Sequence, residues 1–142
     1  AATLAGAANA KSADSWVQLN ALGKEFMRWA LANRASFRAI THPDVGRYAS
    51  EELREAVRHF QDTVRGYIAR AQGDGRYPDT PIDAVAFFTN AVPFGTVMLM
   101  MDPVFEQRAT AEECERLIDQ IMNLVVPIEG RDEKTGIAAS AP

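Results

Sequence analysis

The chain has 142 residues, enough for one domain with a substantial core, and it contains 47% hydrophobic and 24% charged residues, as globular proteins do. Its formal net charge of -4 leaves no basic footprint for binding nucleic acid. The single cysteine, Cys114, excludes an internal disulfide and a cysteine-rich metal cluster.

Apolar residues at helical spacing predict a first helix over residues 14–33. Its apolar stripe consists of Trp16, Leu19, Gly23, Phe26 and Ala30, widened by Leu22, Met27 and Trp29. So wide a stripe indicates that the helix is largely buried. A short helix is expected over residues 34–41. Residues 42–46 are then predicted to form a loop, because Pro43 disfavours helix at the residue before it.

The next long helix is predicted over residues 50–72. Ser50 is a favourable N-cap, and Glu51 and Glu52 lie in the first turn, where the helix dipole favours negative charge. The apolar positions recur every three or four residues and are Leu53, Ala56, Val57, Phe60, Val64, Tyr67, Ile68 and Ala71. Gly73 is expected to end the helix in a left-handed conformation.

Residues 82–101 predict a helix that is apolar on nearly every face. Thr80 should cap it, with Pro81 at the first helical position, and Pro93 should kink it. A core covers only one side of such a helix, so a partner subunit, an apolar ligand or both should cover the rest. Polar residues and Pro93 interrupt the run and no basic residues flank it, so we expect no membrane span.

The last helix is predicted to begin at a capping box formed by Thr110 and Glu113. Its apolar side carries Cys114, Leu117, Ile118, Ile121, Met122 and Val125. Residues 1–14 are expected to be a residual N-terminal segment or linker, and residues 131–142 a flexible tail. Residues 15–130 should therefore form one all-α domain with four long helices and one or two short ones.

These helices resemble the C-terminal domain of TetR-type transcriptional regulators. The resemblance rests on residues 21–23, 26–31, 37–38 and 43–44, then on the arginine-rich helix 50–72, the Gly-Arg-Tyr-Pro turn at 75–78 and two apolar C-terminal helices in the family's order. It extends over residues 16–127. The resemblance implies a helical bundle that binds a small-molecule effector and forms a homodimer through a four-helix bundle.

The chain departs from that family in two places. Nothing before Ser15 resembles the N-terminal helix-turn-helix domain, so we expect DNA to be bound only through a domain absent from this chain. Many of these regulators also read Trp-Ala-x-Val-His-Gly in the apolar helix, whereas this chain reads Asn90-Ala91-Val92-Pro93-Phe94-Gly95. Those positions lie near the family's ligand pocket. Because their residues differ in this chain, the resemblance does not identify the effector.

Two faces of the apolar helix suggest two roles. Phe87, Asn90 and Phe94 share a face that we expect to line the pocket. Asn90 has two possible roles. It could bind the polar group of a ligand, or it could form a structural hydrogen bond across the dimer or to the backbone carbonyl freed by Pro93. The other candidate wall residues, each of which also fits plain core packing, are Trp16, Phe26, Met27, Trp29, Phe60 and Tyr67. His59 is a further candidate hydrogen-bonding residue, or a half-exposed histidine without a role.

The opposite face contains Gly95, which allows close approach of a second helix. We therefore expect a homodimer interface made of Phe88, Gly95, Leu99, Leu117, Ile121 and Val125. An apolar or amphipathic effector would enter beside Pro93. The alternatives are a helical dimerisation or adaptor module without a small-molecule pocket, and a small-molecule carrier on the same fold.

No catalytic motif, metal site or cofactor motif is found in the sequence. His42 and Asp44 are too few ligands for a metal ion, and Cys114 is interpreted as a packing residue among acidic neighbours. The N-terminal segment lacks the basic leader of a signal peptide. We therefore expect a cytoplasmic protein that is not an enzyme.

Overall fold

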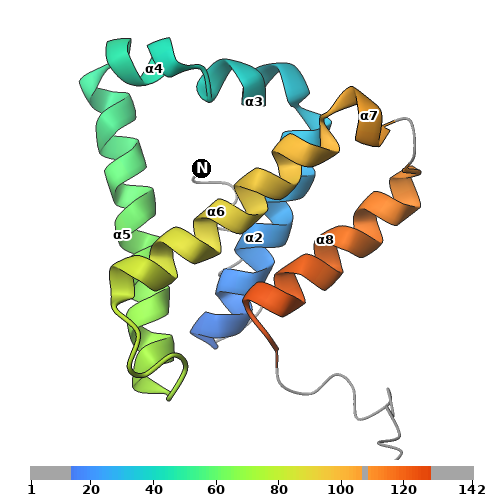
Figure 1. The fold of residues 1–142 in the computed structure, drawn as a ribbon. Coiled ribbons are helices and arrows are strands. Elements are labelled where there is room, and N and C mark those ends of the chain that lie inside the picture. Colours follow the sequence, from blue (N-terminus) through green and yellow to red (C-terminus); the bar gives the residue numbers. More distant parts are fainter. Residues whose placement is uncertain (1–13, 107–108, 129–142) are drawn as a thin grey trace, which may run out of the picture.

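The computed structural model describes residues 14–106 and 109–128, and within these ranges the chain forms seven helices and no strand (Figure 1). The all-α prediction is confirmed. The helices are α2 (Ser15–Ala32), α3 (Arg34–Ile40), α4 (Pro43–Tyr48), α5 (Glu51–Gly73), α6 (Ile82–Met100), α7 (Pro103–Glu106) and α8 (Ala111–Val125). Apart from Asp14, the two predicted terminal segments lie outside the described residues.

Helix α2 is the central element of the fold. It packs against α5, α6 and α8, while α3 and α4 cross from the end of α2 to the start of α5 (Figure 1). The core forms where α2, α6 and α8 meet the C-terminal half of α5. Its most deeply buried side chains are Met27, Phe37, Ile68, Val97, Ile118, Met122 and Val126.

Side-chain caps fix where three of the long helices begin. The Asp14 carboxylate accepts hydrogen bonds from the backbone N–H groups of Trp16 and Val17 at the start of α2. Ser50 Oγ accepts from the N–H of Leu53, as expected for α5. The capping box before α8 is complete, since Thr110 and Glu113 each accept a hydrogen bond from the other's N–H. These predicted starts are confirmed.

Three local predictions were wrong, and in each the position of a glycine or a proline relative to the helix end was misassigned. Residues 43–48 form helix α4 rather than a loop, because proline favours the first helical position although it excludes helix at His42. Gly73 lies inside α5, and the positive φ of 89° belongs to Gly75. Pro81, not Thr80, is the N-cap of α6, and no side chain caps that helix.

Helix α6 runs without interruption through Pro93, and its two sides differ in exposure to solvent. Its buried residues are Val85, Thr89, Pro93, Val97 and Met100. The Thr89 hydroxyl bonds to the carbonyl of Val85, so this polar group is satisfied inside the helix. By length and composition α6 also suits a membrane span, but a core helix of a soluble protein passes the same test. The exposed side of α6 is equally apolar.

Candidate functional site

A cleft of about 780 Å³ lies between α2, α5 and α6. Three helices form its walls. The lining residues are Leu19, Leu22, Gly23 and Phe26 of α2, Val57, Phe60, Gln61, Asp62, Val64 and Arg65 of α5, and Asp83, Ala86, Phe87, Thr89, Asn90 and Pro93 of α6. A second hollow, beside α7 and α8, has less than half this volume, about 330 Å³.

The lining of the cleft is divided between apolar and polar side chains. Leu19 and Leu22 of α2 are buried, and Phe60 of α5 packs at the edge of the core. The polar residues come from α5 and α6, where Gln61 and Asn90 are exposed. An apolar surface bordered by a few polar groups is the usual composition of a small-molecule site.

An ion pair between Arg65 and Asp83 links α5 to α6 at the cleft. Both side chains are substantially exposed, so the pair contributes little to stability, but it ties two walls of the cleft together. Thr89 is satisfied by carbonyls of its own helix. Among the described residues, no intramolecular hydrogen bond is recorded for the side chains of Asn90 and Gln61, which leaves both amides able to bind a ligand.

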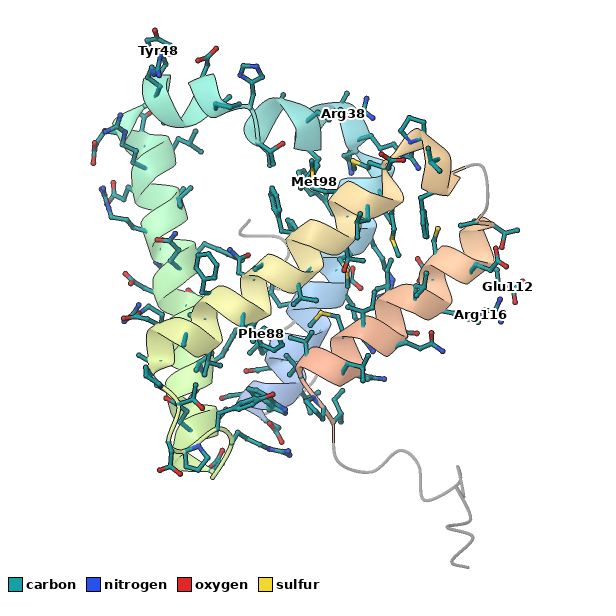
Figure 2. The ribbon with its side chains drawn as sticks, in the orientation of Figure 1. Arg38, Tyr48, Phe88, Met98, Glu112 and Arg116 are labelled. Carbon is teal, nitrogen blue, oxygen red and sulfur yellow. The ribbon has the colours of Figure 1, made fainter. Side chains whose placement is uncertain are left out.

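A second feature is a set of exposed apolar side chains on α6 and α8. We call it the α6–α8 surface, and it consists of Phe88, Leu99, Leu117, Ile121 and Leu124. Figure 2 labels Phe88 on α6. Leu99 is 69% exposed and Leu124 is 78% exposed, while Leu117 and Ile121 are half-buried. Exposed apolar groups of this size are typical of a surface that another molecule covers.

The family comparison identifies the fold. The family model described as tetracyclin repressor-like, C-terminal domain, matches residues 19–125. The chain belongs to this family. No curated protein and no solved structure matches the chain. TetR C-terminal domains generally bind an effector and dimerise, and this is a regulatory family that is typically non-enzymatic.

Four of the residues predicted to line the ligand pocket lie together in the TetR domain's cleft: Phe26, Phe60, Phe87 and Asn90. Phe94 does not line it, and its ring instead packs against Phe37 with 5.5 Å between centroids. His59 is exposed on α5 and lies outside the lining. The ligand-binding role of the first four stays a prediction.

The remaining candidates are core residues. Trp16, Met27 and Tyr67 are buried and lie outside the cleft lining. The Trp16 indole N–H donates to the carbonyl of Pro127 at 2.7 Å, which explains how its polar atom is satisfied without a ligand. For these three side chains, the core-packing alternative matches their position.

Some of the predicted dimer residues are accessible to a partner and one is buried in the chain. Phe88 and Leu99 are exposed and Leu117 and Ile121 are half-exposed, so all four are accessible to a partner. A Cβ atom added at Gly95 would meet nothing within 4 Å, so this glycine is not required by packing within the chain. Val125 is buried inside the chain, whereas its neighbour Leu124 is exposed.

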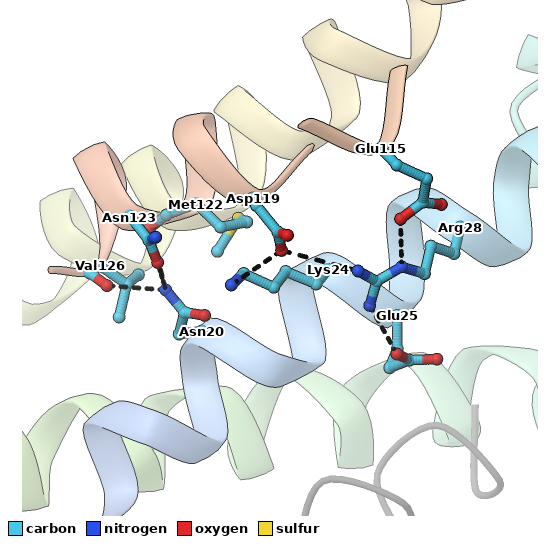
Figure 3. A network of polar contacts seen from close by, with 9 residues as sticks. All are labelled: Asn20, Lys24, Glu25, Arg28, Glu115, Asp119, Met122, Asn123 and Val126. Atoms are coloured by element: carbon cyan, nitrogen blue, oxygen red, sulfur yellow. Dashed lines mark hydrogen bonds and ion pairs between the residues drawn. The ribbon is translucent and has the colours of Figure 1, made fainter. Parts of the chain in front are cut away.

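Sequence reasoning missed a polar contact between α2 and α8 (Figure 3). Lys24 pairs with Asp119 at 3.0 Å, and Arg28 pairs with Glu115 at 3.0 Å. Asn20 completes the row, and we call these residues of α2 and their α8 partners the α2–α8 ladder. The signal was present in the sequence, because Asn20, Lys24 and Arg28 are polar residues four apart on a helix that is otherwise largely apolar.

The buried end of the ladder is Asn20. The two N–H donors of its amide are shared among three acceptors: the carbonyl of Val126 at 2.8 Å, the carbonyl of Met122 at 3.1 Å and Asn123 Oδ1 at 3.1 Å. At the other end, burial opposes the charged form of Arg28, but hydrogen bonds to Glu115 and Glu25 outweigh it and raise the pKa of Arg28. Arg28 therefore carries its charge at neutral pH.

Proposed function

We propose that the chain is the effector-sensing and dimerisation domain of a TetR-type transcriptional regulator. In this proposal the cleft binds an apolar or amphipathic small molecule. The observation that carries it is the cleft's size and lining, because about 780 Å³ falls within the range of roughly 300–1,000 Å³ that drug-sized ligands occupy. The ligand would control DNA binding by a helix-turn-helix domain outside this sequence, in the cytoplasm.

The lining indicates how a ligand would lie. Its apolar part would pack on Leu22 and Phe26 of α2 and on Phe60 of α5. Its polar group would face Asn90 and Gln61, whose amides offer both donors and acceptors. An amphipathic molecule satisfies both parts of the lining at once.

The α6–α8 surface supports the dimerisation half of the proposal. A C2 interface uses the same surface on both subunits, so two copies would bury these apolar side chains against each other in a four-helix bundle. A small residue at Gly95 would let the two α6 helices approach closely. A ligand with different affinities for two helix arrangements would then shift the equilibrium between them.

Titration with the neutral solvatochromic dye Nile red tests the cleft. We expect saturable binding of one dye per chain and at least about a tenfold loss of affinity in Ala86→Phe, because the new ring fills the cleft. Ala56→Phe is the matched control, since Ala56 is exposed on α5 and lies outside the lining. Absence of saturable binding would instead favour the adaptor module.

Asn90→Ala tests the polar part of the same site. Asn90 is exposed, so its loss should leave the melting temperature unchanged while it weakens the binding of an amphipathic ligand. A probe with a polar head, such as decanoic acid, measured by displacement of Nile red, provides the assay. Equal losses of binding and thermal stability would show that Asn90 has a structural role.

A further inference from the structure

Helix α2 is shared between the cleft and α8. Leu19, Leu22 and Phe26 line the cleft, whereas Asn20, Lys24 and Arg28 contact α8. Because residues four apart lie above one another on a helix, these two sets form separate stripes along α2. Any movement of α2 caused by a ligand therefore acts on α8 as well.

The two ends of the α2–α8 ladder are held with different strength. The Asn20 side chain is 1% exposed, and breaking its hydrogen bonds would remove the donor to the carbonyl of Val126, whereas the carbonyl of Met122 keeps the N–H of Val126. The Arg28–Glu115 pair is partly exposed on both sides, and such pairs add little to stability. Helix α8 is therefore firmly attached near its C-terminus and loosely attached near its N-terminus, so Asn20 is placed to serve as a pivot (Figure 3).

Gly23 is a residue of α2 that touches both sides. It lines the cleft, and the space that a side chain would occupy is filled by Met122 of α8. A Cβ atom at this position would lie 2.3 Å from Met122 Cε and 2.6 Å from Sδ. Met122 is buried and precedes Asn123 on the helix that also carries Leu117, Ile121 and Leu124 of the α6–α8 surface. At Gly23, the backbone of α2 thus lies directly between the cleft and Met122 of α8.

We propose that occupancy of the cleft and dimerisation through the α6–α8 surface are thermodynamically coupled by the Gly23–Met122 contact. This inference rests on the proposed function. A ligand in the cleft holds α2 in one position against α5 and α6. Met122 packs on Gly23, and Asn20 is hydrogen-bonded to the end of α8. These two contacts then hold α8 in one position relative to α6. The dimer surface is preorganised, and the dimer becomes tighter.

Sedimentation equilibrium of the full chain, with and without saturating Nile red, measures the coupling. We expect the dimer dissociation constant to fall at least about fivefold when dye is bound, the low end of typical allosteric coupling. Because each dimer binds two dyes, reciprocity requires the dye affinity of each site to be higher in the dimer than in the monomer by the square root of that factor. An unchanged or larger dimer dissociation constant in the presence of bound dye would overturn the proposal.

Gly23→Ala tests the route of the coupling. The added methyl group displaces Met122, so at a dye concentration that saturates the variant the dye should lose most of its effect on dimerisation. Gly66→Ala is the matched control, because a Cβ atom there meets only Arg70 Nη1 at 3.6 Å, an ordinary contact. If Gly23→Ala does not fold, Gly23→Ala combined with Met122→Ala makes room for the methyl group, and the double variant should also be uncoupled. Wild-type coupling in either variant would contradict the route.

The outcomes separate this inference from the proposed function. Absence of saturable dye binding would overturn the effector cleft and the coupling together. Saturable binding by a chain that remains monomeric, or whose dimerisation ignores the dye, would overturn the coupling and leave the cleft intact.

Discussion

The two sides of α6 have the same kind of residues and opposite surroundings. Val85, Val97 and Met100 are buried against the rest of the chain, whereas Phe87 and Leu99 are 79% and 69% exposed. Because both sides are apolar, composition alone does not distinguish them, and the difference comes from where α2 and α8 pack. The comparison shows that the chain completes its own core and leaves a second apolar side of α6 exposed.

Paired aspartate substitutions on α6 should give the largest contrast between its two sides. Val97 is fully buried, and a charge there costs several kcal/mol, comparable to the total stability of roughly 5–15 kcal/mol of a domain. We expect Val97→Asp to unfold the chain and Leu99→Asp, two residues on, to remain helical. Far-ultraviolet circular dichroism and thermal melts measure both. A folded Val97→Asp, or an unfolded Leu99→Asp, would invalidate the assignment of the two sides.

Removal of the buried amide at the α2–α8 contact should have the next largest effect. Asn20→Ala leaves the carbonyl of Val126 without its side-chain donor, whereas the carbonyl of Met122 keeps the N–H of Val126, and the loss should cost about 2 kcal/mol. Asn123→Ala is the control, because it removes one partly exposed contact and retains both carbonyl bonds. Urea denaturation should show a clear loss for the first variant and a change below about 0.5 kcal/mol for the second. Equal losses would argue against Asn20 as the anchor of α8.

Gly95→Gln sharpens the comparison on the exposed side. A Cβ atom at Gly95 would meet no other atom within 4 Å, so a side chain fits there. Because glutamine favours helix more than glycine does, the monomer should gain up to about 1 kcal/mol of stability. The same side chain would separate the two α6 helices of a dimer, and we expect dimerisation to weaken at least about tenfold, or 1.4 kcal/mol. Sedimentation and denaturation together test this. An unaffected dimer would show that α6 is not at the interface.

The smallest expected effect concerns the start of α8. The backbone hydrogen bond from Thr110 lowers the pKa of Glu113 below its ordinary value of 4.5. The stabilisation is therefore present above that ordinary value and is lost as the pH falls through the lowered pKa of the folded state. Glu113→Gln should differ from the wild type most at neutral pH and least in acid. A difference in melting temperature that is constant between pH 7 and pH 3 would contradict this.

Much of the fold follows from the sequence because its signals are local. Helical periodicity and the caps at Ser50 and Thr110 predict two helix starts that the structure confirms. Pro43 was misread because proline both ends and begins helices, and only the preceding residue, extended at His42, distinguishes the two cases. Local rules thus identify the helices but decide less well how short connections fold.

The candidate site was less predictable because three helices build it. Asn90 and Phe60 were identified as polar or aromatic residues on plausible faces, and both line the cleft. Trp16 and Met27 have the same chemistry, and the packing of α2 puts them in the core instead. Gly23 carried no signal of a role, since its importance lies in the distance to Met122, a residue almost one hundred positions away in the sequence.

Native mass spectrometry of the chain mixed with Nile red tests the central claim most directly. The claim is that α6 serves a ligand cleft on one side and a second subunit on the other. The account predicts a dimer that retains one dye per chain, and predicts that Ala86→Phe retains the dimer and loses the dye. A bare monomer under the same gentle conditions would contradict both halves of the account.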